Sequence, residues 1–356
     1  MKLTRRTFFT LAGLAALGIT TPACRQMLWQ ILFSPKATPA PPPAPFSNPF
    51  TARGRSLVAL VHGGDVRVMV RRALELIGGL DRLDLKGRHA LVKPNVVSGE
   101  APPATTDPRV VTEVAELVRR AGASRVAIGD MSAVLALPTR PNLERTGIAK
   151  VARDIGAELL AFDEGEWVEV NPPGAEWAKT VYVARAVHEA ERLISVPVIK
   201  THRSASYSCA LKNTVGCVHG KNKPWAYGSA GWEPSVAELN VAVRPHLFVV
   251  DGLTSMVAGG PWSGDAAPTN VILASGDPIA TDVIALGLLK TFGRWELVTT
   301  KGVWEQTQIR RAIALGLGAR GPEEVELRAE SLGGDRQEFT RLVAEIRRQV
   351  GLGPSG

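Results

Sequence analysis

From Arg55 onwards the chain alternates short apolar runs with longer amphipathic stretches, and this alternation constrains the fold more than any other feature of the sequence. Short apolar runs bounded by turn residues are typical of buried strands, whereas apolar residues spaced three and four apart indicate helices. Strands that are separated by helices need right-handed crossovers, which place helices on both faces of a mainly parallel sheet. The sequence therefore predicts an α/β fold.

The expected elements follow from these two periodicities. We expect strands over Ser56–Val61, His89–Val92, Arg125–Ile128, Glu158–Phe162, Arg192–Ile199, Leu247–Val250 and Val271–Ala274. We expect helices over Val66–Ile77, Pro108–Ala121, Leu143–Ile155, Val236–Val243, Ile279–Leu289, Gln308–Leu315 and Arg336–Val350. The runs Trp167–Val170 and Thr180–Val183 predict a small β excursion from this pattern.

The N-terminus has the pattern of an export signal. Arg5 and Arg6 precede Phe8 and Phe9, and a short apolar run that contains Gly and Ala follows over Leu11–Ile19. A basic start before a short, weakly hydrophobic run is typical of secretory signals, and the arginine pair resembles a twin-arginine signal. We therefore expect the twin-arginine translocase as a partner during export, and a location in the periplasm or on the outer face of the cytoplasmic membrane.

The fate of this leader stays open, with three alternatives. It is cleaved near Ala23, lipidated at Cys24, or retained as an anchor that holds the protein at the membrane. A proline-rich segment over residues 35–50 then predicts an extended spacer. We expect three parts: a signal or anchor over residues 1–34, the linker over 35–50, and a single α/β domain over 51–356.

The net charge of +8 does not indicate a nucleic-acid partner. Five of the 42 lysine and arginine residues lie before residue 37, where no acidic residue occurs, so 37 basic residues face 34 acidic ones in the remainder, a net charge of +3. No basic stripe with interleaved aromatic residues is present.

The cysteines exclude the usual iron–sulfur motifs. The three cysteines, Cys24, Cys209 and Cys217, include no CxxC pair. On one helix Cys209 and Cys217 would lie about 12 Å apart, too far for a disulfide, so a bridge would require a loop that folds back. Two semi-buried thiols are the simpler interpretation.

Several expected strands end in an ionisable group. These endings are Lys93-Pro94-Asn95, Gly129-Asp130, Lys200-Thr201-His202, Asp251-Gly252 and Ser275-Gly276-Asp277. Ligands bind outside the carboxyl ends of the strands in an open parallel sheet, so we expect the five endings to converge on one site. The aspartates are also common turn and helix N-cap residues, and this alternative stays open.

Residues 196–224 concentrate lysine, histidine, asparagine and threonine behind a strand that should be buried. If Ser206–Val215 is a helix, Lys212 and Asn213 lie well inside it, which indicates packing against the site. The glycines of Gly259-Gly260-Pro261-Trp262-Ser263-Gly264 allow the backbone to approach a ligand, although the loop matches neither a P-loop nor a dinucleotide fingerprint. Pro224–Tyr227 is interpreted either as a cover over the site or as a packed loop.

These blocks together resemble a known family, the domain-of-unknown-function family 362, over residues 57–290. The blocks are Lys93-Pro94-Asn95, Thr105-Thr106-Asp107-Pro108, Gly129-Asp130, Lys200-Thr201-His202, Leu211-Lys212-Asn213 with Gly216, Lys223, Asp251-Gly252, the Gly-Gly-Pro-x-x-Gly loop, and Asp277 with Asp282. Several members of that family carry ferredoxin-type cysteine motifs, which this sequence lacks, so the resemblance implies no redox role. It supports the fold and the site more than a reaction.

The sequence leaves three hypotheses about function, and whether the protein is an enzyme stays open. The first is a site for a small anionic ligand, with Lys200, His202 and Lys212 as catalytic groups and Lys93, Asn95, Asn213, Lys223, Gly260 and Gly264 as binding groups. The second is a divalent metal held by Asp130, Asp251, Asp277 and Asp282 with His202, for hydrolysis. The third is a non-catalytic, membrane-tethered binding or assembly factor. The cofactor stays unidentified at this point.

Overall fold

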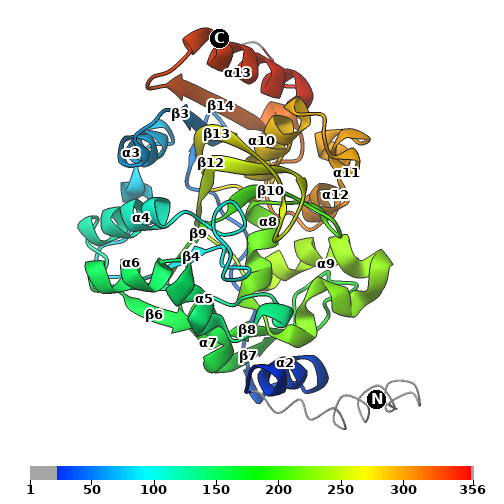
Figure 1. Cartoon of the computed structure of the whole chain (residues 1–356). Helices are drawn as coiled ribbons and strands as arrows, with labels where there is room; N and C mark the ends of the chain where they lie inside the picture. The colour runs from blue at the N-terminus through cyan, green and yellow to red at the C-terminus, as the bar shows by residue number, and fades with distance from the viewer. Residues whose placement is uncertain (1–21, 354–356) are drawn as a thin grey trace.

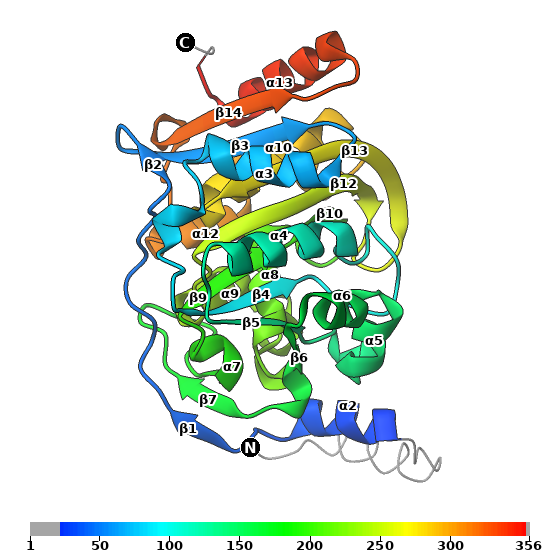
Figure 2. The same ribbon diagram turned by 90° about the vertical axis from the view of Figure 1, so that its left-hand side faces the viewer.

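The computed structural model of the protein describes residues 22–353, so the arginine pair and the apolar run behind it lie outside the described residues. In this range an α/β domain is built around an eleven-stranded sheet, whose main path runs β14-β3-β13-β12-β9-β4-β5-β6, with β2, β10 and β11 attached. Figure 2 shows these strands stacked from β14 at the top to β6 near the bottom, with the small second sheet of β1, β7 and β8 below them.

The described strands are β1 (Ala37–Pro39), β2 (Thr51–Ala52), β3 (Arg55–His62), β4 (His89–Pro94), β5 (Arg125–Asp130), β6 (Glu158–Ala161), β7 (Trp167–Val170), β8 (Val181–Ala184), β9 (Arg192–Val196), β10 (Val198–His202), β11 (Ser206–Ser208), β12 (Leu247–Gly259), β13 (Gly264–Ser275) and β14 (Val325–Ser331). The described α-helices are α2 (Pro22–Leu32), α3 (Val66–Leu76), α4 (Pro108–Arg120), α5 (Thr139–Arg145), α6 (Ile148–Ile155), α7 (Arg185–His188), α8 (Ala210–Asn213), α9 (Gly228–Ala242), α10 (Pro278–Thr291), α11 (Glu296–Thr299), α12 (Thr307–Ala314) and α13 (Arg336–Val350).

Helices cover both faces of the sheet, which confirms the predicted fold class. Helices α3, α4 and α6 lie on one face of the sheet, and α8, α9, α10, α12 and α13 lie on the other (Figure 1). Their buried side chains form two separate cores with the two faces of the sheet. A third core lies between the sheet end and the small sheet that contains β7 and β8, so the expected β excursion is confirmed. Helix α10 illustrates how the layers form. Apolar residues lie on all sides of it, so it is buried almost throughout, between the sheet and the outer helices.

One strand runs against the others, and this reversal decides what lies at the site. β13 pairs antiparallel with both β12 and β3, while the remaining neighbours on the main path are parallel. The end of β13, where Ser275 leads into Asp277, therefore lies at the opposite edge of the sheet from the ends of β4, β5 and β9. We expected all five polar strand endings on one edge, and for this strand the prediction was wrong.

Three expected elements differ from the structure because a local residue interrupts them. The helix expected over Leu143–Ile155 is divided into α5 and α6 at Gly147, whose φ is +82°. The strand expected over Arg192–Ile199 is divided at Pro197 into β9 and β10, and β10 moves across to pair with β12 and β11. In place of a helix over residues 206–215, β11 is followed by one short turn of helix, α8.

The proline-rich segment lies on the domain rather than away from it. β1 pairs in parallel with β7, and the Ala40 N–H donates to the carbonyl of Glu169. Phe50 is fully buried in the first core. Residues that we expected to form a spacer are thus held to the domain by the hydrogen bonds of β1 and Ala40 and by the burial of Phe50.

Helix α2 is also packed against the domain. The Gln30 side chain is 3% exposed, and its Oε1 accepts a 2.9 Å hydrogen bond from the backbone N–H of Gly220. A Cβ at Gly220 would lie 2.5 Å from the Gln30 carbonyl oxygen, so this contact requires glycine. Met27 and Ile31 pack against the third core from the same helix.

We predict that Gln30→Ala destabilises the protein, because it leaves the buried N–H of Gly220 without an acceptor. An unsatisfied buried donor costs about 1–3 kcal/mol, and the free energy of unfolding should fall by that amount in urea titrations of the full chain. Gln337→Ala is the control, since Gln337 is exposed on α13. Equal unfolding free energies for the two variants would show that α2 does not contribute to the fold.

Candidate functional site

A cavity of about 460 Å³ lies where β4, β5 and β10 end, and it gathers most of the polar residues predicted from the sequence. The loop between β12 and β13 and the 3-10 turn η6 (Pro224–Tyr227) close its sides. Its ionisable and polar lining comes from Asn95, Asp130, Lys200, His202, Arg203, Ser204, Ser208, Lys212 and Lys223, and the backbone of Gly260 lies beside them. The expectation that strand endings converge is thus met for β4, β5 and β10.

A buried ion pair lies at the floor of the cavity. Lys93 Nζ is 2.6 Å from Asp130 Oδ1, with both side chains 2% exposed or less. Lys93 also donates to Asn213 Oδ1 at 3.1 Å and to the carbonyl of Pro94 at 2.8 Å. The other oxygen of Asp130 accepts from the N–H of Val96 at 2.6 Å. With this many partners the pair is a structural unit, and Lys93 and Asn213 lie behind the cavity rather than in its lining.

The backbone of Gly216 packs directly against this ion pair. A Cβ at Gly216 would lie 2.1 Å from Asp130 Oδ1 and 2.7 Å from Lys93 Nζ. Only glycine allows the backbone to approach so closely. The position of Gly216, three residues after Asn213, therefore follows from the ion pair itself.

Lys200 is oriented by two acceptors and has an unusual proton affinity. Its Nζ donates to Asn95 Oδ1 and to the carbonyl of Ala104, each at 2.6 Å, and the side chain is 1% exposed. Burial, with the nearby charge of Lys212, lowers the pKa of Lys200 to about 7. A neutral amine has two hydrogens, and the two acceptors use both, so its lone pair is left for a third group. Lys200 is thus able to take up a proton near neutral pH.

Two more lysines face the cavity, and each has a lowered pKa. Burial lowers the pKa of Lys212 to about 8 and that of Lys223 to about 7. Lys223 Nζ donates to the carbonyl of Val215 at 2.6 Å, whereas Lys212 has no hydrogen-bond or ion-pair partner among residues 22–353. An unpaired ammonium in a buried site is costly, so a negative group next to Lys212 would be strongly favoured.

His202 is held as a neutral ring. Its Nδ1 accepts a 3.1 Å hydrogen bond from the N–H of Ser204, so the neutral ring carries its proton on Nε2. Burial, with the charges of Lys212 and Lys200, lowers the pKa of His202 well below its ordinary value. His202 is therefore a hydrogen-bond donor at neutral pH and not a cation.

Sequence reasoning missed the apolar half of the cavity. Leu135, Trp225, Trp232 and Trp262 line it, and they come from four separate segments of the chain. Trp232 lies on α9, and its Nε1 is buried without a hydrogen-bond partner among the described residues. Pro224–Tyr227 and the Gly-Gly-Pro-x-x-Gly loop were noted for position and backbone, but only the tertiary structure places their tryptophans at one opening.

The four aspartates expected to hold a metal do not come together. Asp277 lies at the opposite edge of the sheet, where it caps α10 and accepts from the Ser56 hydroxyl at 2.7 Å. Asp282, on α10, accepts from Ala210 N–H at 2.6 Å and from Tyr207 OH at 3.0 Å, and burial raises its pKa to about 7. Within residues 22–353, no three His, Cys, Asp or Glu side chains are arranged to hold a metal ion.

Asp251 lies inside β12 rather than at its end, and it holds the loop next to the site. It accepts from the Asp107 N–H at 2.7 Å and from the Leu253 N–H at 3.1 Å, and burial raises its pKa to about 6. Its partner Asp107 is the N-cap of α4. The capping interpretation of these aspartates therefore describes Asp251, Asp277 and Asp282 better than metal binding does.

Of the remaining residues singled out in the sequence, the two glycines shape the loop between β12 and β13, and the two cysteines lie in the hydrophobic cores. Gly260 has a φ of +81° and approaches the carbonyl of Thr201, where a Cβ would lie 2.0 Å away. Gly264 pairs with Gly259 at the start of β13 and does not line the cavity. Cys209 packs in the second core and Cys217 in the third, as separate buried thiols.

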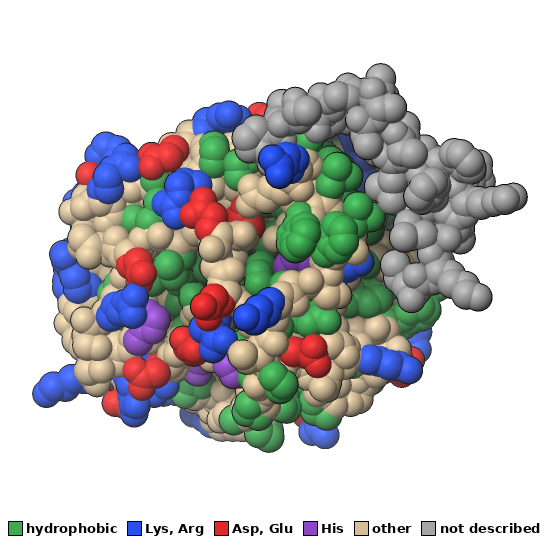
Figure 3. Space-filling model, turned by 90° about the horizontal axis from the view of Figure 1, so that it is seen from below, with side chains coloured by type: hydrophobic (Ala, Val, Ile, Leu, Met, Phe, Trp, Pro, Cys, Tyr) green, Lys and Arg blue, Asp and Glu red, His purple; other side chains and the backbone are tan. Residues whose placement is uncertain are grey.

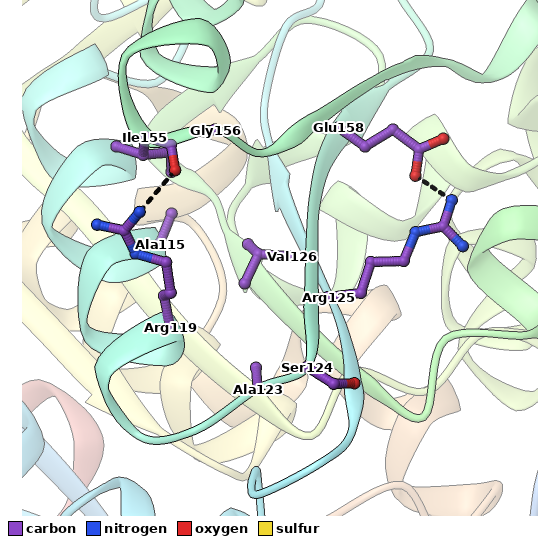
Figure 4. A pocket seen from close by; sticks show the side chains of 9 residues that line it. All are labelled: Ala115, Arg119, Ala123, Ser124, Arg125, Val126, Ile155, Gly156 and Glu158. Carbon is purple, nitrogen blue, oxygen red and sulfur yellow. Dashed lines mark hydrogen bonds and ion pairs between the residues drawn. The ribbon is translucent and has the colours of Figure 1, made fainter.

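A second hollow, of about 280 Å³, lies at the other end of β5 (Figure 4). Arg119 donates there to the carbonyl of Ile155 at 2.8 Å, and Arg125 forms an ion pair with Glu158. Each of its charged side chains thus already has a partner. The cavity at the C-terminal ends of β4, β5 and β10 is therefore the candidate site.

A family model matches the part of the chain that builds this cavity. The family model described as "Domain of unknown function (DUF362)" matches residues 90–287, which include every ionisable group that lines the cavity. The chain belongs to this family. The match spans β4 to α10, the same segment that builds the site.

Two known proteins are similar to parts of the chain. The "Thylakoid-associated protein sll1697" of Synechocystis sp. is 27% identical over 234 residues, which cover 64% of this chain and 71% of that protein. The solved structure of the lactate racemase apoprotein from Thermoanaerobacterium thermosaccharolyticum is 13% identical, with a TM-score of 0.38, and the match covers 56% of this chain and 50% of that one.

We predict that Gly216→Ala strongly destabilises this DUF362 protein, because a Cβ would displace the buried Lys93–Asp130 pair. Breaking a buried pair costs about 3–5 kcal/mol, which chemical denaturation would detect as a loss of unfolding free energy. Gly64→Ala provides the control, since a Cβ there meets no atom within 4 Å. A Gly216→Ala variant as stable as the control would mean that the pair tolerates displacement.

Proposed function

We propose that the cavity binds a small molecule with a carboxylate or phosphate group, that Lys200 exchanges a proton with it, and that His202 donates a hydrogen bond to it. The observation that carries this proposal is the imbalance of charge in the lining. Lys200, Lys212 and Lys223 face the cavity, while the one carboxylate found in the lining of the described chain, Asp130, is already paired with Lys93. An anion between the three lysines would relieve their repulsion and restore their charges.

The three lysines differ in the roles that we propose for them. Lys212 has no other partner and would contact the anion directly. Lys223 is held by the Val215 carbonyl and would contribute charge from the opposite side. Lys200, with a pKa of about 7, would act as a base or an acid, and the Nε2–H of His202 would donate a hydrogen bond to the ligand. Trp232 Nε1 offers a further unused donor.

We predict that Lys212→Met lowers the affinity for propyl phosphate more than tenfold while leaving the melting temperature unchanged or higher. Hydrogen bonds to charged groups contribute about 1.5–3 kcal/mol, and removal of an unpaired buried ammonium relieves a cost to the fold. Titration calorimetry and thermal denaturation would measure the two effects. Lys200→Met should lose both binding and stability, since Asn95 and the Ala104 carbonyl then lose their donor.

The control Lys179→Met, at an exposed lysine, should change neither the affinity for propyl phosphate nor the melting temperature.

We also predict that the affinity of the wild-type protein for propyl phosphate falls between pH 7 and 9, because in the free protein the lysines with a pKa of about 7 and about 8 lose their charge over that range. The phosphate monoester keeps its charge there, since its second pKa is about 6. An affinity that stays constant to pH 9 would contradict the role of the lysines.

We also infer that the protein is exported by the twin-arginine translocase and works at the outer face of the cytoplasmic membrane or in the periplasm. The sequence of residues 4–19 supports this proposal, as does the thylakoid association stated in the name of the Synechocystis relative. None of the helices between residues 22 and 353 combines the length and apolar character needed to cross a bilayer.

We predict that Arg5→Lys together with Arg6→Lys retains the full chain in the cytoplasm of a host with this translocase, because its receptor reads the arginine pair as an address. Cell fractionation and immunoblotting would locate the protein. The matched control is Lys2→Arg, which keeps the basic start of the leader. Export of the double variant at the wild-type level would contradict the assignment.

A further inference from the structure

The mouth of the cavity exposes large apolar side chains. Leu135 is 71% exposed, Trp225 41% and Trp262 40%, and all three line the cavity. Leu135 lies in the 3-10 turn η2 (Val134–Ala136), Trp225 in η6, and Trp262 at the tip of the β12–β13 hairpin. These three residues, called the apolar rim below, therefore surround the opening from three separate segments. Exposed apolar surface beside a binding site marks a surface that contacts a partner.

Helix α2 carries a second exposed apolar group close to this rim. Trp29 is 57% exposed and Phe33 50%, and their rings stack with centroids 4.5 Å apart. The same helix contacts η2, which carries Leu135, and the 3-10 turn η5 (Gly220–Asn222), which precedes Lys223. The buried Gln30 fixes this position through Gly220. Helix α2 is thus held against one turn that lines the cavity and another that precedes Lys223.

The chain that enters α2 and the charges nearby indicate what covers this surface. Residues 8–19, which precede α2 in the sequence, are almost wholly apolar. Arg25 on α2 and Arg203 at the cavity are exposed. Aromatic and basic side chains together are typical of elements that lie in the interface of an anionic bilayer. Figure 3, which views the molecule from the side where α2 lies, shows hydrophobic side chains near the centre, with both basic and acidic side chains around them.

We propose that α2 and the apolar rim lie on a bilayer surface, and that the ligand is an anionic amphiphile taken from that bilayer. This inference rests on the proposed function, because it assigns the anionic group to the lysine site. The cavity, at about 460 Å³, is larger than a phosphate or carboxylate group requires and continues into an apolar wall that includes Met131 and Val134. The anion lies between the lysines, and its hydrocarbon chain lies along this wall and leaves through the rim.

The first test compares two phosphates that differ only in their hydrocarbon chain, propyl phosphate and dodecyl phosphate below its micelle concentration. The full chain should bind dodecyl phosphate at least tenfold more tightly. Leu135→Ser with Trp225→Ser should remove that difference and leave propyl phosphate binding unchanged. Leu332→Ser, a control at an exposed leucine outside the cavity, should leave both affinities unchanged. Trp225→Phe should keep the preference, which checks that the loss arises from apolar surface.

The results separate this inference from the proposed function. Equal affinity for the two phosphates would overturn the amphiphile while leaving the anion site intact. Binding of neither phosphate would overturn the proposed function and this inference with it. Loss of both affinities in Lys212→Met, together with loss of only the chain preference in the rim variant, is the expected pattern.

The second test asks whether the rim meets the bilayer. The full chain is mixed with phosphatidylglycerol vesicles whose acyl chains carry bromine, which quenches nearby tryptophan fluorescence. Trp225→Phe with Trp262→Phe should lower the quenched fraction, whereas Trp177→Phe, at another exposed tryptophan, should not. Unchanged quenching in the rim variant would overturn the bilayer as the source of the ligand, even if the free amphiphile binds.

Discussion

The buried pair of Lys93 and Asp130 is the interaction on which the site depends. It joins the ends of β4 and β5, orients Asn213 at the end of α8, and requires glycine at position 216. Because breaking such a pair leaves an uncompensated charge in the interior, every segment that touches it is held in one arrangement. Within the pair, the charge of Lys93 balances that of Asp130. The remaining lysines then face a space without an available carboxylate among the described residues.

Burial gives these lysines their chemistry. An exposed lysine stays charged at neutral pH, but desolvation lowers the pKa of Lys200 and Lys223 to about 7 and that of Lys212 to about 8. The Asn95 amide and the Ala104 carbonyl hold Lys200 in place, whereas Lys212 has no acceptor among the described residues. The two lysines are therefore suited to different roles, proton transfer for Lys200 and direct contact with an anion for Lys212. Asp282 contributes from behind by holding the start of α8, the turn that carries Lys212. Asp251 and Asp282 thus hold segments next to the site through hydrogen bonds from backbone N–H groups.

The sequence predicted the fold class and the residues at the ends of β4, β5 and β10, because the apolar periods and the polar strand endings are local signals. It did not predict that β13 runs antiparallel, since strand direction depends on which neighbours pair and not on the strand's own residues. For this reason Asp277 was placed in the site although it lies at the opposite edge. The aromatic wall was missed for a related reason: Trp225 and Trp232 lie on the neighbouring elements η6 and α9, but Leu135 and Trp262 come from distant parts of the chain, and only tertiary packing brings them to the same cavity.

The N-terminal segment shows how composition alone can mislead about function. Proline over residues 35–50 indicated a spacer, yet β1 pairs with β7 and Phe50 is in the core. A spacer would let the domain turn freely relative to a membrane. A segment that is attached to the domain at both ends, through β1 and through Phe50, fixes the orientation instead, and Gln30 connects α2 to the turn before Lys223. Where the leader holds this DUF362 protein at a bilayer, as we propose, the same contacts decide which face of the domain meets the lipid.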